Sequence, residues 1–389
     1  MPLILTINSG SSSLKFSLYE MRASENLLLA GAVERIGLDS GVFRIDGREQ
    51  SAHIPDHDRA LEVLFDTLAQ HESKRKLDAV GHRLVYGGRE HENPQIITPG
   101  LLKDLDRLTT IAPEHLPHEL KAIQAVSRLH PGLAQVACFD TAFHCASPQI
   151  ATLYPLPRLY WEQGLMRYGF HGLSYAYIVD ELKREGAECG RVIVAHLGNG
   201  ASMAAIRDGK PVDTTMGFTP SGGLMMGTRS GDLDPGAVLY LVEQNGMSAK
   251  AAREIVNQKA GLLGVSGISS DMQQLLAKEA TEPHAAQAIA LFCYQAKKFL
   301  GALAAILGGL DLVVFTAGIG EHAPSVRARI CEGLECFGIH LDADRNQANA
   351  PVISLSASRV VVRVMKTNEE LMLVRHTHEV LRKVGSGVG

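Results

Sequence analysis

The sequence predicts an α/β protein made of two halves that share one plan. The stretch at 4–20 consists of an apolar strand, an Asn/Gly/Ser turn and an alternating strand, and the stretch at 192–209 repeats this order. Helical patterns alternate with short apolar strands in both halves. A length of 389 residues also fits two domains of roughly 100–200 residues each. We therefore predict two mixed α/β domains that arose by duplication.

The first half opens with strands and is then mixed. Short apolar runs bounded by Gly, Ser and Asp predict strands at 3–7, 15–19, 28–33, 41–45, 78–85 and 134–139, of which 41–45 is a hairpin partner. Between the last two strands, Leu120, Ile123, Val126 and Leu129 recur at helical spacing. This spacing predicts a helix over 117–129.

The second half restarts the same pattern after residue 190. The turn at Asp208-Gly209 separates two of the strands predicted at 191–195, 202–206, 211–215, 312–316 and 359–364. Helices are predicted over 283–307, from about 323, and from about 367 to 384. Because no low-complexity linker interrupts the chain, we expect the two domains to meet across a close cleft.

Composition and charge exclude several classes of protein. The chain has 46% hydrophobic and 21% charged residues, and 38 basic against 42 acidic side chains give a net charge of −4. We therefore expect no nucleic-acid partner and no anionic membrane surface. The most hydrophobic region, 299–315, is interrupted by glycines and Asp311, which argues against a membrane span. The N-terminus lacks a basic leader, which argues against a secretory signal. We expect a cytoplasmic protein with no membrane association, whose six cysteines are reduced and mostly buried.

Two polar turns have the composition of phosphate-binding loops. The turn from Asn8 to Lys15 offers hydroxyls, backbone amides and an ammonium, although an ordinary Ser/Gly hairpin reads the same way. The segment from His196 to Ser202 repeats this composition with Gly198 and Gly200, which let backbone approach an anion closely. Neither is a Walker A loop. One such turn in each half is a more specific signal for phosphate binding than a single turn would be.

The segment Gly318-Ile319-Gly320-Glu321-His322-Ala323 follows a buried strand and lies about 20 residues before Asp342. This is formally a dinucleotide fingerprint. Too little chain follows for the second half of a dinucleotide-binding sheet, however, so we do not expect an NAD site. The same geometry also suits the phosphates or sugar of a mononucleotide.

Charged residues at strand ends and in glycine-rich loops are candidates for chemistry. Arg83 and Arg229 stand among glycines, where a guanidinium suits a carboxylate or a transferring phosphoryl group, although either could be a surface arginine. Asp140 and His171 are predicted near strand ends, where catalytic carboxylates and imidazoles are common. Either side chain could equally have a structural role. Glu369 and the neighbouring Glu370 are either first-turn acids capped by Thr367 or include a metal ligand. The paired histidines at 53/57, 115/118 and 376/378 lack zinc-type partners.

Together these strings resemble the acetate kinase family, within the acetate and sugar kinase, chaperone and actin superfamily. INSGSSSLK, GHRLVYGG, FDTAFH, YGFHG, HLGNGAS, DTTMGFTP, GLMMGTRSGDLDP, GLLGVSGISSD, FTAGIGE and TNEEL occur in the family's order over nearly the whole chain. The resemblance implies duplicated actin-like (ribonuclease H-like) domains, each a five-stranded mixed sheet flanked by helices, with the active-site cleft between them. We expect an N-terminal domain of residues 1–145 with a C-terminal helix at about 371–389, and a nucleotide-binding domain of residues 146–370.

The resemblance also implies an activity and its residues. The expected reaction is reversible phosphoryl transfer from ATP to acetate, giving ADP and acetyl phosphate, with Mg²⁺ or Mn²⁺, in a homodimer. The catalytic set falls on Asp140, His171, Arg229 and Arg83, the acyl site on Arg83, Val85, Phe170 and Pro220, and the metal ligands on Asn8 and Glu369. The nucleotide contacts fall on Lys15, Ser11, Ser13, His196, Leu197, Gly198, Asn199, Gly200, Asp271, Met272, Gln273, Gly318, Ile319, Gly320, Glu321 and His322.

The sequence departs from the family pattern at several site positions. Glu114 stands where the family usually has leucine beside the acyl pocket, and Leu173 and Tyr175 replace a hydroxyl and an imidazole. Further departures are 221–223, Met272, Gln273 and His322. A propionate or other short-chain acyl kinase is therefore the nearest alternative, because one methylene changes discrimination by only about 1–3 kcal/mol. A sugar or polyol kinase and an actin-like ATP-binding module are more distant alternatives.

Overall fold

The computed structural model describes residues 1–389 except 23, 39, 72–75, 188–189, 244–245 and 387–389. The chain forms two compact units. The first comprises Met1–Phe143 with Asn368–Gly389, and the second comprises His144–Thr367.

The first unit contains one mixed sheet and four longer helices. Its strands, in chain order, are β1 (Leu3–Ser9), β2 (Ser13–Met21), β3 (Glu25–Glu34), β4 (Gly41–Ile45), β5 (Arg48–Ala52), β6 (Ala79–Leu84), β7 (Gln95–Ile96) and β8 (Ala134–Phe139). Its helices are α1 (His57–His71), α2 (Pro99–Leu108), α3 (Leu116–Leu129) and α15 (Glu369–Gly385). In the described residues the strands form an eight-stranded sheet in the order β5-β4-β3-β2-β1-β6-β8-β7.

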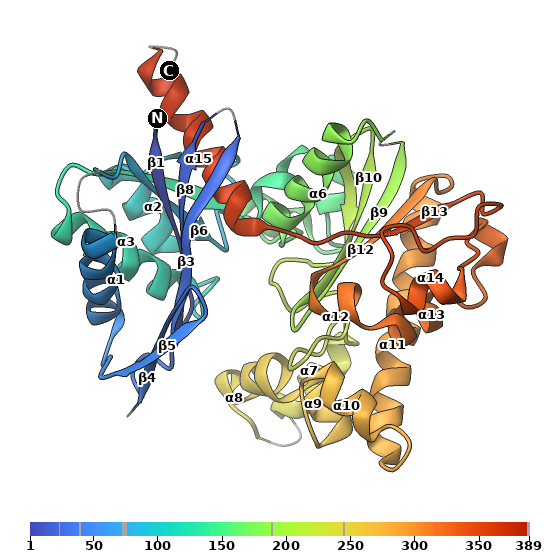
Figure 1. Ribbon diagram of the computed structural model, residues 1–389. Coiled ribbons are helices and arrows are strands. Elements are labelled where there is room, and N and C mark those ends of the chain that lie inside the picture. The colour runs from blue at the N-terminus through green and yellow to red at the C-terminus, as the bar shows by residue number, and fades with distance from the viewer. Residues whose placement is uncertain (23, 39, 72–75, 188–189, 244–245, 387–389) are drawn as a thin grey trace. The chain divides into compact units, whose positions relative to one another are not determined.

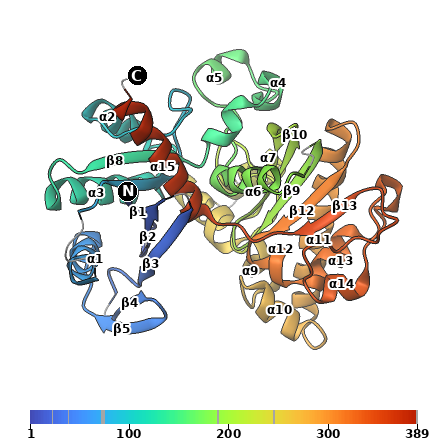
Figure 2. The same ribbon diagram turned by 45° about the horizontal axis from the view of Figure 1, so that its top comes forward.

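The alternation of side chains along β1 explains how helices cover this sheet. Leu3, Leu5 and Ile7 pack into one apolar cluster with residues of α1 and α3. Ile4 points the other way and packs with Val374 of α15. Since successive strand residues point to opposite faces, both faces of β1 are buried. Figures 1 and 2 show α15 running along the sheet on the face away from α1.

The second unit contains a five-stranded sheet and a larger set of helices. Its strands are β9 (Arg191–Leu197), β10 (Ala201–Arg207), β11 (Lys210–Thr214), β12 (Leu312–Thr316) and β13 (Val361–Val364). Its helices are α4 (Gln149–Thr152), α5 (Arg158–Glu162), α6 (Gly172–Arg184), α7 (Pro235–Glu243), α8 (Ala249–Glu254), α9 (Gly261–Ser266), α10 (Met272–Lys278), α11 (Pro283–Ile306), α12 (Ala317–His322), α13 (Pro324–Cys331) and α14 (Ala343–Gln347). The sheet, in the order β11-β10-β9-β12-β13, packs against α6, α11 and α12.

The two sheets share one topology. In the first unit β1 pairs antiparallel with β2 and parallel with β6, while β3 and β8 extend the two sides in the same senses. In the second unit β9 pairs antiparallel with β10 and parallel with β12, with β11 and β13 outermost. This is the repeat that the sequence predicts. The expectation of five strands in each sheet is wrong for the first unit, because β4 and β5 add a hairpin beyond β3 and β7 adds an edge strand beyond β8.

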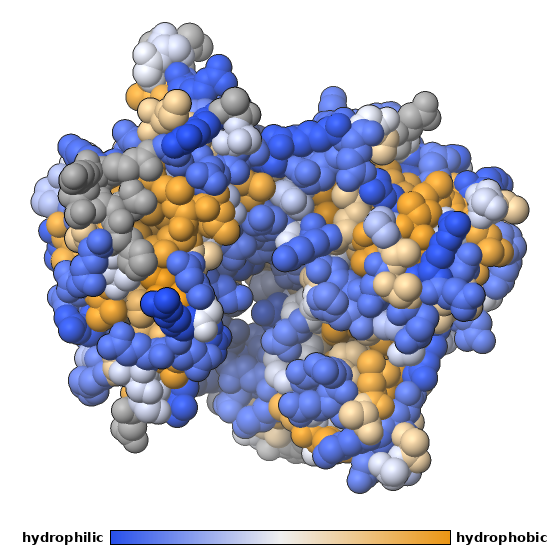
Figure 3. Space-filling model, in the orientation of Figure 1, coloured by the Kyte–Doolittle hydropathy of each residue, from blue (hydrophilic) through white to orange (hydrophobic). Residues whose placement is uncertain are grey.

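One helix among the described residues, α11, is long and apolar enough by composition to cross a membrane. The sequence analysis did not identify this helix as a candidate membrane span, because the helix starts before the most hydrophobic region, 299–315. Nine of its residues are buried, and it packs against α9, α10 and α13, as a core helix of a globular unit does. Hydrophilic residues cover most of the face shown in Figure 3, and hydrophobic residues form separate patches there.

The cysteines are placed largely as expected. Within the described part of the chain, Cys138, Cys293 and Cys331 are buried, Cys145 and Cys336 are exposed, and all five are free thiols. Burial raises the pKa of the Cys138 thiol to about 12, so this side chain is an inert apolar filler. Cys189 lies outside the described residues.

Candidate active site

Arg83 is the centre of a polar cluster in the first unit. It lies near the end of β6, and its Nε and Nη2 donate to the Asp140 carboxylate at 3.2 and 2.5 Å. Its Nη1 donates to Asn8 Oδ1 at 3.4 Å and lies 3.8 Å from Glu369 Oε2. The structure thus brings together four of the residues singled out from the sequence, from β1, β6, the end of β8 and the start of α15.

Burial and charge together define this cluster. The Asp140 side chain is 1% exposed, whereas Arg83 keeps 18% of its side chain accessible. Burial alone would lower the pKa of the Arg83 guanidinium, but the carboxylates of Asp140 and Glu369 outweigh it and raise the pKa above its usual value. Arg83 is therefore a permanent cation, held in one orientation by a forked contact and still able to meet an anion.

The polar turn between β1 and β2 is shaped by backbone hydrogen bonds. Gly10 N–H donates to Ser13 O at 2.7 Å, and the His57 ring is hydrogen-bonded to Gly10 O at 2.7 Å. Ser11 and Lys15 are exposed, and Ser13 is half-buried. The side chains predicted to contact phosphate are thus accessible, on a turn that its own backbone fixes.

His171 belongs to a buried hydrogen-bonded network in the second unit. It precedes α6 in a left-handed conformation (φ 57°), and its ring stacks on His196 with centroids 4.2 Å apart. Nδ1 of His171 is hydrogen-bonded to Ser202 Oγ at 2.8 Å, and Ser202 Oγ also contacts the hydroxyl of Tyr175. Burial raises the pKa of the Tyr175 phenol, which keeps it neutral. Tyr175, a departure from the family pattern, is thus a structural partner of Ser202.

Ser202 was predicted only as the end of the second polar turn, although it fixes one nitrogen of His171. We expect Ser202→Ala to lower kcat about tenfold because the imidazole loses its orienting partner. Steady-state kinetics in both directions measure the effect. Tyr175→Phe is the matched control, since it removes one hydroxyl but leaves the Ser202–His171 bond. Equal kcat values for Ser202→Ala and the unmodified protein would contradict this prediction.

The side chains of Arg229 and His171 both lie close to Gly200. A Cβ built on Gly200 would lie 3.2 Å from His171 Nε2 and 3.5 Å from Arg229 Nη1. The Arg229 Nη1 also donates to Pro220 O at 3.1 Å. Glycine at 200 therefore leaves the space between an imidazole and a guanidinium open, beside the loop that follows β9. This is a placement from which both groups can reach one anionic ligand.

A cavity of about 730 Å³ in the second unit is lined by half of the predicted nucleotide residues. Its lining includes eight of them: Gly198, Asn199, Asp271, Met272, Gln273, Gly318, Ile319 and His322. Asp271 caps α10 by accepting from Gln273 N–H and Gln274 N–H at 2.7 and 3.2 Å. The cavity has the size of a small-molecule ligand site.

The other predicted nucleotide residues of this unit lie outside that lining. Leu197 and Gly200 belong to the β9–β10 loop and its strand end, and His196 is stacked on His171. Gly320 is buried within α12. Glu321 Oε1 accepts from the backbone N–H groups of Ala317 and Thr367 at 2.9 and 3.3 Å, so its carboxylate ties α12 to the chain before α15.

A buried arginine supports this end of the cavity, and sequence reasoning missed it. Arg327 on α13 is 0% exposed and donates to the carbonyls of Gly320 and Glu321 at 2.9 and 3.0 Å. It also donates to Asn346 Oδ1 at 2.8 Å. Burial lowers the pKa of Arg327 to about 10, so it remains charged at neutral pH. The side chain satisfies carbonyls at the end of α12, which would otherwise lack partners.

The predicted acyl-site residues are divided between the two units. Val85 follows β6 in the first unit and is half-buried, and Glu114 lies just before α3. Phe170 and Pro220 belong to the second unit, where Phe170 is 2% exposed and its carbonyl is hydrogen-bonded to His144 at 3.0 Å. Phe170 is therefore fixed within its own unit by packing and by a hydrogen bond at its backbone carbonyl.

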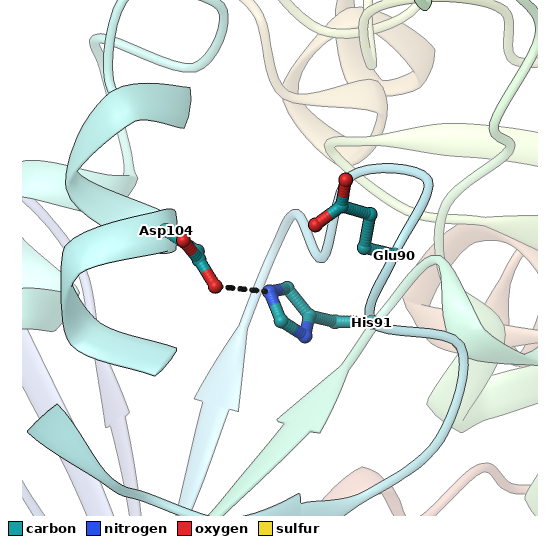
Figure 4. Close-up of side chains that lie close together, drawn as sticks. All are labelled: Glu90, His91 and Asp104. Atoms are coloured by element: carbon teal, nitrogen blue, oxygen red, sulfur yellow. Dashed lines mark ion pairs between the residues drawn. The ribbon is translucent and has the colours of Figure 1, made fainter. Parts of the chain in front are cut away.

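A second polar cluster consists of Glu90 and His91, in the loop that follows Val85, and Asp104 on α2 (Figure 4). His91 Nε2 faces Asp104 Oδ2 on α2 at 3.8 Å, and its ring stacks on Phe139 with centroids 6.0 Å apart. Phe139 directly precedes Asp140. When the imidazole is protonated, this ion pair ties the loop to α2 next to the Arg83 cluster.

Known proteins resemble this chain over nearly its whole length. The acetokinase family model matches residues 3–375. The acetate kinase of Rhodopseudomonas palustris (strain TIE-1) is 46% identical over 387 residues, covering 96% of this chain and 97% of that protein. The crystal structure of Porphyromonas gingivalis acetate kinase superposes with a TM-score of 0.90 at 38% identity, covering 98% of this chain and all of that one.

A crystal structure of a propionate kinase from Francisella tularensis is also similar, with a TM-score of 0.92 at 34% identity over 97% of this chain and 99% of that one. These full-length superpositions confirm the expected fold class, a duplicated actin-like α/β architecture. Since the family model spans nearly the whole sequence and the relatives exceed 30% identity along it, this chain belongs to the acetokinase family and is a kinase.

Proposed function

We propose that this chain is an acetate kinase that transfers the terminal phosphoryl group of ATP directly to acetate, reversibly and in line. The observation that carries this proposal is the Arg83 cluster, in which a fixed guanidinium stands among Asn8, Asp140 and Glu369. The cavity lined by Gly198, Asp271 and Gly318 supports ATP or ADP as the second substrate. The family membership supports both assignments.

The chemistry of a carboxylate acceptor matches this cluster. A carboxylic acid with a pKa of about 4–5 is ionised at neutral pH, so its oxygen is a nucleophile that needs no general base. The barrier is the repulsion between a carboxylate and a polyphosphate. Arg83 attracts the carboxylate and, with His171 and Arg229, is assigned to the oxygens of the transferring group. His171 and Arg229 are assigned there because they flank Gly200. Asp140 orients Arg83 through three hydrogen bonds and does not take a proton.

Asn8 and Glu369 fit a divalent cation by their donor chemistry. An amide oxygen and a carboxylate oxygen are hard ligands of the kind that Mg²⁺ prefers, and both approach the same Arg83 Nη1, at 3.4 and 3.8 Å. These two oxygens therefore already converge on a positive group. Mg²⁺, or Mn²⁺, would supply charge neutralisation on the phosphate oxygens when bound.

A hydroxylamine trap tests the proposed reaction. The purified protein with Mg-ATP is given formate, acetate, propionate or butyrate, and the acyl hydroxamate is measured. We expect hydroxamate with each accepted acid and the highest kcat/KM with acetate. Because one methylene is worth only about 1–3 kcal/mol in a pocket, propionate is expected within about 10–200-fold of acetate.

The other outcomes separate the alternatives. A maximum with propionate or butyrate would keep the chemistry and change the preferred acid, which the similarity to a propionate kinase and the half-buried Glu114 make the second candidate. No hydroxamate with any acid, despite ATP binding, would contradict the proposal. Phosphorylation of glycerol or a hexose would then indicate a hydroxyl acceptor, for which Asp140 would have to act as a base.

We also infer the setting in which the enzyme works. We assign residues 1–145 with about 371–389 to the acyl-kinase domain and 146–370 to the nucleotide-binding domain. We propose a cytoplasmic homodimer that acts on small molecules only. Exposed Tyr240 and Tyr294, 60% and 68% accessible, are apolar surface that a second copy could cover. Light scattering of the purified protein measures the oligomeric state.

A further inference from the structure

The peptide unit between Leu84 and Val85 is held at both of its polar groups. The Leu84 carbonyl accepts from Asp140 N–H at 2.8 Å. The Val85 N–H donates to the Glu119 carboxyl on α3, with both carboxyl oxygens 3.2 Å from the nitrogen. This peptide lies one residue beyond Arg83, where β6 ends at Leu84. Glu119 therefore holds the main chain where the sheet no longer does.

Glu119 is an acidic residue at a buried position, which is uncommon in proteins. It is 3% exposed, and burial raises the pKa of its carboxyl to about 8, against the opposing effects of the Val85 hydrogen bond and the Arg83 charge. Arg83 and Asp140 are the charged groups that act on it. The carboxyl is thus mostly protonated at neutral pH. An uncharged acid beside Arg83 does not compete with an anionic substrate for that guanidinium.

We propose that Glu119 is a positioning residue of the acid-binding site, which fixes the main chain between Arg83 and Val85 and thereby sets how a short monocarboxylic acid meets the Arg83 guanidinium. This inference rests on the proposed function and deepens it. Glu119 does not touch the reacting atoms. It acts through the Val85 amide on one side of the peptide, as the Asp140 amide acts on the other.

Two variants of nearly equal volume test this role. Glu119→Leu removes the acceptor of the Val85 N–H and with it the contact that fixes this peptide, so kcat/KM for acetate is expected to fall about 10–100-fold. The KM for ATP is expected to stay within about twofold, because the nucleotide cavity lies in the second unit. Glu119→Gln keeps an acceptor oxygen and is expected to stay within about threefold of the unmodified enzyme.

The pH dependence distinguishes positioning beside Arg83 from a merely structural role. In the unmodified enzyme, kcat/KM for acetate is expected to decline above pH about 8, as Glu119 ionises next to Arg83. Glu119→Gln cannot ionise and is expected to lose that decline. Stability follows the same group: because its pKa is raised from 4.5 in the unfolded chain to about 8 in the folded one, unfolding free energy falls between these pH values, and Gln removes this fall.

The outcomes separate this inference from the proposed function. Unchanged kcat/KM for acetate in Glu119→Leu, or an unchanged alkaline decline in Glu119→Gln, would overturn the role of Glu119 and leave the kinase assignment intact. If Glu119→Leu fails to fold, the pH profile of Glu119→Gln alone decides. No acyl transfer by the unmodified enzyme with any acid would overturn the proposed function itself, and the role of Glu119 with it.

Discussion

Replacing Arg83 by alanine is expected to lower kcat for acyl transfer about 10³–10⁵-fold, the range found for arginines that stabilise a transferring phosphoryl group. Arg83→Lys keeps the charge but loses the fork that meets Asp140 through Nε and Nη2. Since a lysine ammonium cannot make both contacts in one plane, this variant is expected to lose about 10²-fold. The hydroxamate assay measures kcat and the KM for acetate in each variant.

Binding of nucleotide provides the internal comparison for this result. The cavity lined by Asp271, Met272 and Gly318 belongs to the other unit, so titration calorimetry with ADP is expected to give the same affinity in Arg83→Ala and in the unmodified protein. Arg107→Ala is the matched control, because the Arg107 side chain is 69% exposed and its ion pair with Asp104 lies at the surface. An Arg83→Ala enzyme that retains more than a tenth of its kcat would remove Arg83 from the transition state.

Much of the fold could be predicted from the sequence because the strands of both halves carry strong local signals. The apolar run at 3–7 corresponds to β1, whose two faces pack against different helices. The small additional strands β5 and β7 were not predicted: β5 is a polar edge strand, and β7 has only two residues. Their pairing depends on contacts with β4 and β8, which no local pattern encodes.

The candidate site was predictable only in part, because motifs mark residues and not their partners. Asn8, Arg83, Asp140 and Glu369 were singled out separately, and the structure brings them around one guanidinium. Glu119 was missed although it stands four positions before Ile123, on the buried face of α3, where an acidic residue is itself a signal. Arg327 and Ser202 act through tertiary contacts with α12 and His171, which spacing alone cannot reveal.

Asp140→Asn is expected to lower kcat about 10²-fold and to leave the acid limb of the rate profile unchanged. The carboxylate is 1% exposed and accepts three hydrogen bonds from Arg83, so its charge orients and stabilises the guanidinium. Asparagine has one oxygen to offer where the carboxylate has two, so the fork is lost and Arg83 is misplaced. The pH dependence of kcat/KM for acetate between pH 5 and 8 measures the expected behaviour.

The acid limb decides what Asp140 does. If Asp140 only orients Arg83, the limb reflects ionisation of groups other than Asp140, and it persists in Asp140→Asn at the same pH. If Asp140 removed a proton from a hydroxyl acceptor, the limb would disappear with it, and the reading of this protein as an acyl kinase would be wrong. Loss of stability is the competing explanation for a lower kcat, since an unpaired buried charge costs about 3–5 kcal/mol. Urea unfolding of the same sample separates the two, because misfolding lowers the active fraction without changing KM, whereas a misplaced guanidinium raises KM for acetate in fully folded enzyme.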